Sequence, residues 1–147
     1  MFVHATAVAL RSRGQWRAVL LRGPSGSGKS DLAIRLVQAG NRLIADDQTH
    51  LAKQRRALIA SPPPSLAGMI EVRGLGIVRL ARHQLLARAP VALLVDLVPS
   101  GKVERLPEPQ AEMLLDTAVP RLALAPFEAS AVGKLWLALT ESAAASS

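Results

Sequence analysis

One segment near the N-terminus has a glycine-rich spacing that is typical of phosphate binding. Residues 23–30 read GPSGSGKS, which is Gly, four residues, Gly, Lys and Ser. Glycines let backbone N–H groups turn towards phosphate oxygens, the lysine reaches the terminal phosphates, and the last hydroxyl ligates Mg²⁺. The N-terminus of a following helix adds positive potential. We therefore expect a nucleotide-binding loop made of Gly23, Pro24, Ser25, Gly26, Ser27, Gly28, Lys29 and Ser30.

A pair of carboxylates forms the second candidate feature. Asp46 and Asp47 follow the short apolar run Arg42 to Ala45, at the end of a predicted strand. Ligands of an open α/β sheet bind at this end of the strands, and adjacent strand residues point to opposite faces. One carboxylate could accept a proton from an attacking hydroxyl while the other orients metal-bound water. The alternative is an Asx turn that merely ends the strand.

An acid and a base lie two residues apart further along the chain. Glu71 and Arg73 share one face of a predicted strand, just before Gly74 and Gly76. That arrangement can hold Mg²⁺ and phosphate together. The alternative is a surface ion pair beside a turn. The three histidines have no metal-binding spacing, and on pattern alone each is structural.

The elements that must position these residues follow from hydrophobic periodicity. Phe2 to Leu10 and Trp16 to Leu21 read as two strands, and Lys29 to Ala39 as a helix that stops at Gly40. The predicted order is thus strand, phosphate loop, helix, strand, acid pair. This is the context that a phosphate loop requires.

Downstream elements are predicted in the same way. Val91 to Val98 has the strongest strand pattern, and we expect a central, buried strand there. The other expectations are a hairpin of His50 to Lys53 with Ala57 to Ile59, strands at Ile70 to Val72 and Ile77 to Leu80, a loop at Pro99 to Pro109, a short helix at Gln110 to Leu115, a strand at Arg121 to Ala125, a helix at Ser130 to Thr140, and a frayed tail at residues 141–147.

Composition limits the classes of function. The 147 residues fit one domain, 1–140, and their net charge of +7 favours anionic partners. The arginines are scattered and aromatic residues are few, so nucleic-acid binding is not favoured. No apolar run is long enough to cross a bilayer, so we expect no membrane partner. The lack of cysteine fits a cytoplasmic protein.

Several motifs together resemble the catalytic domain of HPr kinase/phosphorylase. They are His4 at a strand start, GPSGSGKS, LIADD at residues 43–47 and IEVRGLGIV at residues 70–78. The resemblance covers roughly residues 2 to 140, and it matches only the C-terminal half of longer family members. It implies an α/β fold, a P-loop-containing sheet with flanking helices, similar to the nucleotide-binding core of phosphoenolpyruvate carboxykinase.

The resemblance also implies a reaction, which is phosphoryl transfer from ATP to a serine of HPr, the small carrier of the phosphotransferase system. Lys29 would bind the β and γ phosphates. Asp47 would accept the proton, with Asp46 as the competing assignment. His4, Arg73 and Arg105 would belong to the catalytic site, and Ser30, Asp47 and Glu71 are the candidate Mg²⁺ ligands. A homo-oligomer, commonly a hexamer, is expected by resemblance.

One segment departs from the family pattern. Residues 125–133 read APFEASAVG, where the family has a basic loop with a Pro, Gly, Arg and Asn motif that serves phosphorolysis of the phosphoserine. Kinase activity is therefore expected, with weak phosphorylase activity at most. The other hypotheses are a P-loop small-molecule kinase or nucleotide hydrolase, and a non-catalytic nucleotide-binding regulator.

Overall fold

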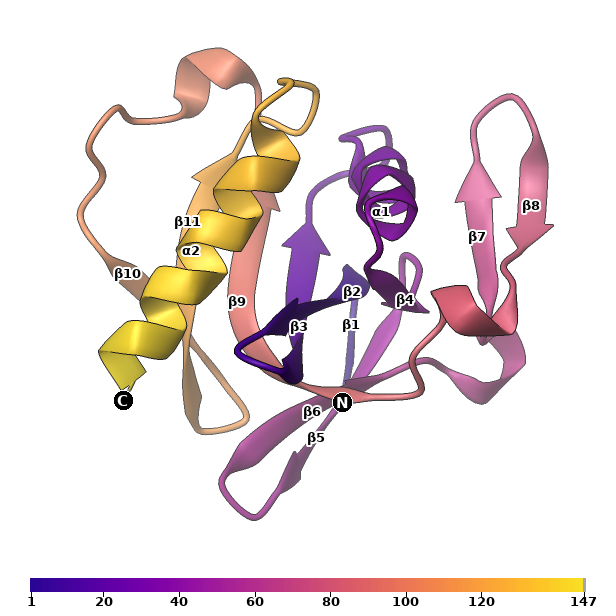
Figure 1. The fold of residues 1–147 in the computed structure, drawn as a ribbon, viewed down its shortest axis with the longest axis horizontal. Coiled ribbons are helices and arrows are strands. Elements are labelled where there is room, and N and C mark those ends of the chain that lie inside the picture. Colours follow the sequence, from indigo (N-terminus) through magenta and orange to yellow (C-terminus); the bar gives the residue numbers. More distant parts are fainter. Residues whose placement is uncertain (147) are drawn as a thin grey trace.

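The computed structural model describes residues 1–146, with side chains up to residue 140. A nine-stranded sheet runs through the molecule in the order β1-β5-β6-β9-β3-β2-β4, and β11 pairs with β9 and with β10 (Figure 1). A separate two-stranded hairpin, β7–β8, stands to one side. The strands are β1 (Phe2–Val3), β2 (Thr6–Ser12), β3 (Gln15–Arg22), β4 (Arg42–Ala45), β5 (Thr49–Gln54), β6 (Ala57–Ser61), β7 (Met69–Val72), β8 (Gly76–Arg79), β9 (Ala89–Leu97), β10 (Gln110–Leu114) and β11 (Thr117–Leu124), and the α-helices are α1 (Lys29–Gln38) and α2 (Ala131–Ser146).

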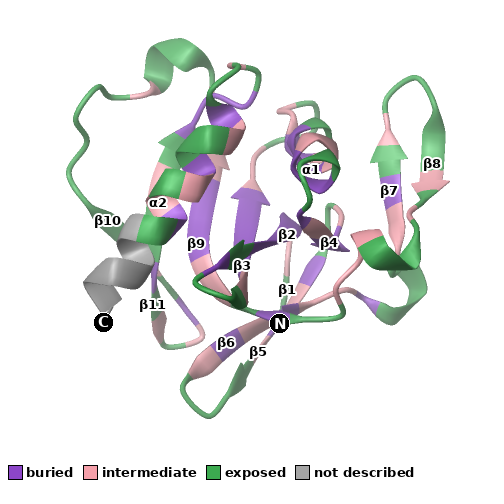
Figure 2. Ribbon diagram, viewed as in Figure 1, coloured by how far each residue is buried: buried purple, intermediate pink, exposed green. Residues whose placement is uncertain are grey.

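Side chains of the central strands alternate between two apolar cores. In β2, Val8 and Leu10 join the core beneath the two helices, whereas Ala7 and Ala9 join the core on the opposite face. This period of two is what a strand imposes, and burial on both faces explains the almost continuous apolar runs. The central strands are accordingly buried in Figure 2. Both cores together fix the ends of β3 and β4, where the site lies.

Strand β9 has the central place that its sequence predicts. It runs parallel to β3 and to β11, and its first residues pair antiparallel with β6. The predicted β5–β6 and β7–β8 hairpins and the two α-helices are also present. The mixed α/β class is confirmed. No helix in the part of the chain that the structure describes is long and apolar enough to cross a membrane.

Two predicted elements are wrong. The helix expected at Gln110 to Leu115 is strand β10, which pairs with β11 through a turn whose residues, Leu115 and Asp116, both have positive φ. The expected first strand is divided at His4 and Ala5 into β1, on the edge beside β5, and β2. The tail expected at residues 141–147 lies outside the residues whose side chains are described.

Candidate active site

The glycine-rich loop joins the end of β3 to the start of α1, as predicted. Gly28 precedes the helix with φ of 102°, a left-handed conformation that favours glycine. A Cβ at this position would also lie 2.9 Å from Cζ of Phe127. Glycine at residue 28 therefore suits the left-handed turn, and its lack of a side chain leaves room for Phe127. The turn directs the loop into a cavity of about 560 Å³.

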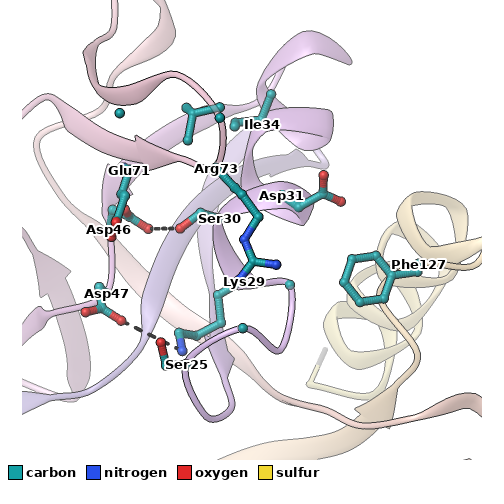
Figure 3. A pocket seen from close by; sticks show the side chains of 15 residues that line it. Ser25, Lys29, Ser30, Asp31, Ile34, Asp46, Asp47, Glu71, Arg73 and Phe127 are labelled. Atoms are coloured by element: carbon teal, nitrogen blue, oxygen red, sulfur yellow. Dashed lines mark hydrogen bonds and ion pairs between the residues drawn. The ribbon is translucent and has the colours of Figure 1, made fainter.

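The Lys29 side chain is almost buried within this loop. Its ammonium donates to the carbonyl oxygens of Gly23, at 2.5 Å, and Pro24, at 3.2 Å. It also lies 3.8 Å from Oδ1 of Asp47. The charge of Lys29 is thus held between the phosphate loop and one of the two carboxylates (Figure 3), where it can bind an anionic group.

Asp46 is the most extensively bonded carboxylate of the cavity. Its Oδ1 accepts hydrogen bonds from the hydroxyls of Ser30, at 2.8 Å, and Thr6, at 3.0 Å. Its Oδ2 accepts from the backbone N–H of Glu71, at 3.0 Å. Asp46 therefore links β2, the start of α1 and β7.

Asp47 faces a different set of partners. Its Oδ1 lies 2.8 Å from Nε2 of His4, and both side chains are 62% exposed. The backbone of Asp47 is left-handed, with φ of 64°. The two aspartates diverge, as expected for adjacent residues at a strand end, so they have different neighbours and can have different roles. A solvent-facing carboxylate next to an imidazole and an ammonium suits proton acceptance.

The β7–β8 hairpin contributes the third wall of the cavity. Glu71 and Arg73 line it together with the phosphate loop and the aspartates. Figure 3 shows the Arg73 guanidinium directed across the loop, and a terminal nitrogen lies 3.9 Å from where a Cβ would stand on Gly26. The hairpin thus brings one acid and one base to the same site.

A Mg²⁺ ion fits the residues that surround Asp46. Ser30 Oγ and the Asp46 carboxylate are in contact, and the Glu71 side chain lines the same cavity. Asp47, the aspartate that the sequence offers as a Mg²⁺ ligand, lines the same cavity, but its carboxylate faces His4 and Lys29 and the one bonded to Ser30 is Asp46. Among the described residues, no group of three or more His, Cys, Asp or Glu side chains could hold a metal by itself. Mg²⁺ usually takes only one or two carboxylates and completes its shell with phosphates and water.

The structure differs from the predicted set of site residues at two positions. Arg105 is exposed in the segment between β9 and β10 and does not line the cavity. Thr6 was not singled out, although its hydroxyl contacts Asp46. A lone threonine within an apolar strand carries no recognisable pattern, so only the pairing of β2 with β4 reveals its position.

A cluster of four charged side chains lies on the other side of the phosphate loop. Arg22, directly before Gly23, bonds Asp96 at 2.7 Å and Glu112 at 2.7 Å, and Arg121 bonds Asp96 at 2.7 Å. Hydrogen bonds to Arg22 hold the pKa of Glu112 below its ordinary value. Burial raises the pKa of Asp96, but the hydrogen bonds from both arginines outweigh it and the net pKa is lowered. The cluster ties the end of β3 to β9, β10 and β11.

Comparison with known proteins identifies relatives of this chain. The HPr kinase/phosphorylase of Lacticaseibacillus casei strain BL23 is 34% identical over 113 residues, which cover 71% of this chain and 35% of that protein. That of Geobacillus thermodenitrificans strain NG80-2 is 35% identical over 115 residues, which cover 72% and 37%. The chain thus spans about a third of the length of these curated relatives.

A solved structure and a family model extend the comparison to nearly the whole chain. The structure of the Hpr(Ser) kinase/phosphatase from Coxiella burnetii matches with a TM-score of 0.82 and 23% identity, covering 99% of this chain and 92% of that one. That likeness bears on the fold. The model of the HPr Serine kinase C-terminal domain matches residues 2–145. The chain therefore belongs to the family of HPr serine kinase C-terminal domains.

Proposed function

We propose that this chain is a Mg²⁺-dependent protein kinase that transfers the γ-phosphoryl group of ATP to a serine of HPr. The observation that carries the proposal is the grouping, in one cavity, of the phosphate loop with two aspartates that have separate partners. A kinase needs both a place for phosphates and a carboxylate free to accept a proton. Family membership supports HPr as the acceptor.

The residues of the cavity have separate roles in phosphoryl transfer. The loop N–H groups and Lys29 bind the phosphates of ATP, and Arg73 adds positive charge above the loop. Ser30, Asp46 and Glu71 hold Mg²⁺, which neutralises charge on the phosphates when bound. Asp47, oriented by His4, accepts the proton of the serine hydroxyl. Arg105 lies outside the cavity and has no part in this assignment.

The direction of transfer is a further part of the proposal. Phosphorolysis requires inorganic phosphate to approach a phosphoserine, and the two anions repel unless cations offset their charge. Residues 125–133 hold no Lys or Arg, and Glu128 pairs with Lys134 at 3.0 Å. We expect release of pyrophosphate from phosphorylated HPr, excess phosphate and Mg²⁺ to be slower than the kinase reaction. Equal rates in the two directions would show that this loop does not set the direction.

Mixing the protein with ATP labelled at the γ position, Mg²⁺ and HPr tests the proposal. Label should appear on HPr, and HPr whose acceptor serine is alanine should stay unlabelled. Label on a small molecule, or hydrolysis without transfer, would instead support a small-molecule kinase or a nucleotide hydrolase. Binding of ATP without turnover would support a nucleotide-binding regulator. Size-exclusion chromatography with light scattering would test the proposed homo-oligomer.

A further inference from the structure

A single hydroxyl on β2 is bonded to both aspartates of the site. Thr6 Oγ1 donates to Oδ1 of Asp46 at 3.0 Å and accepts from the backbone N–H of Asp47, also at 3.0 Å. Thr6 is fully buried. The hydroxyl therefore donates its one proton to the first aspartate and offers an oxygen lone pair to the amide of the next.

The two contacts act on different properties of the site. The bond to Asp46 fixes the oxygen that also accepts from Ser30, so it orients the group proposed to hold Mg²⁺. The bond to the Asp47 amide holds a backbone that has φ of 64°, a conformation that residues other than glycine seldom adopt. That backbone turns the Asp47 side chain towards His4 and Lys29.

The local shape of the sheet places Thr6 where it can do this. The pairing of β2 with β4 shifts register between Ala7 and Val8, next to the site. β2 starts two residues after His4, so the same turn of chain supplies His4 to the Asp47 carboxylate and Thr6 to its amide. The divergence of Asp46 and Asp47 is thus maintained by residues from one neighbouring segment.

We propose that Thr6 is a positioning residue that sets both the metal-binding orientation of Asp46 and the proton-accepting orientation of Asp47. This inference rests on the function proposed above. It concerns a residue that does not line the cavity and acts through the Asp46 carboxylate and the Asp47 backbone. Supporting groups one step removed from a metal typically change metal affinity or activity by about 10- to 100-fold when they are lost.

Three substitutions separate positioning from simple packing. Thr6→Val keeps the volume and removes both hydrogen bonds, while Thr6→Ser keeps the hydroxyl. Thr49→Val is the matched control, because Thr49 is equally buried on a nearby strand and its hydroxyl bonds only the carbonyl of Ala5, at 2.8 Å. We expect Thr6→Val to lower kcat about 10- to 100-fold. Thr6→Ser should restore most of that loss, and Thr49→Val should leave kcat near the wild-type value.

Two further measurements do not depend on HPr. Calorimetric titration of ATP at several Mg²⁺ concentrations should show that Thr6→Val needs more Mg²⁺ for the same ATP affinity, whereas Thr49→Val does not. Hydrogen exchange of the ligand-free protein should show faster exchange of the Asp47 amide in Thr6→Val alone. Should Thr6→Val not fold, Thr6→Ala is measured in the same way, since it also lacks the hydroxyl.

The outcomes distinguish this inference from the proposed function. A wild-type protein that does not label HPr contradicts the function, but the Mg²⁺ titration and the exchange rates still test Thr6. A folded Thr6→Val protein with wild-type kcat and Mg²⁺ dependence overturns the positioning role. So does a loss of equal size in Thr49→Val, because burial alone would then account for it.

Discussion

Replacing each aspartate by asparagine should separate stability from catalysis. Both substitutions remove a negative charge at constant size, and asparagine tolerates the left-handed backbone of residue 47. The surroundings differ. Asp46 accepts three hydrogen bonds from the protein, two on one oxygen and one on the other, whereas Asp47 is 62% exposed and contacts His4 and Lys29.

The size of each effect follows from these partners. An asparagine at 46 has one acceptor oxygen, so its NH₂ group must face either the hydroxyls or the Glu71 N–H. An unpaired donor at such a place costs about 1–3 kcal/mol, or roughly 2–12 °C in Tm for a chain of this size. Asp47→Asn leaves no such donor and should change stability by about 0.5 kcal/mol or less. Its kcat should nevertheless fall about 10²- to 10⁴-fold through loss of the proton acceptor.

Thermal melts and steady-state transfer to HPr, performed on the same preparations, give the comparison. Asp47→Asn should melt like the wild type, bind ATP normally and turn over slowly. Asp46→Asn should melt earlier and require more Mg²⁺. If Asp46→Asn kept wild-type Mg²⁺ dependence while Asp47→Asn lost it, the assignment of the two carboxylates would be reversed. Equal Tm values for the wild type and both variants would contradict the predicted cost of the lost hydrogen bond at residue 46.

Three further outcomes are expected. Lys29→Ala should lower kcat about 10²- to 10³-fold, because it removes a preorganised cation next to the charge that develops on the transferred phosphoryl group. Near-normal turnover would show that residues 23–30 are not the phosphate-binding loop. Glu71→Gln should shift the Mg²⁺ titration to higher concentration, since an amide is a weaker ligand than a carboxylate, and superimposable titrations would exclude Glu71 from the metal site. The folded-state pKa values of Asp96 and Glu112 are lowered, so their contribution to stability should be complete above about pH 5. That contribution should disappear as the pH falls below their unfolded pKa values near 4. The double variant Asp96→Asn/Glu112→Gln should therefore flatten this part of a Tm-against-pH curve.

Local patterns predicted the parts of the site that depend on neighbours in sequence. The GPSGSGKS spacing defines a loop by its own backbone chemistry, so its placement between β3 and α1 followed directly. The alternation of adjacent residues at a strand end also predicted that Asp46 and Asp47 would have different partners. Which of them meets Ser30 could not be predicted in this way, because it depends on how β4 ends against α1 and β2.

Features decided by tertiary pairing were missed. Residues 110–114 lie in a strand because β11 pairs with them through Leu115 and Asp116, a turn without the glycine or asparagine that usually marks such hairpins. The importance of Thr6 is equally invisible in sequence, since its two partners are 40 and 41 residues away. The family resemblance predicts Arg105 at the catalytic site, but Arg105 does not line the cavity.

The most direct test of the central claim is single-turnover transfer of labelled γ-phosphate from ATP to HPr, measured for the wild type beside Lys29→Ala and Asp47→Asn. The cavity around the phosphate loop should be the site of transfer, so the wild type should label a serine of HPr in the presence of Mg²⁺ and both variants should lose most of the rate while remaining folded. Wild-type rates in both variants, or a wild type that binds Mg²⁺ and ATP and leaves HPr unlabelled, would contradict it.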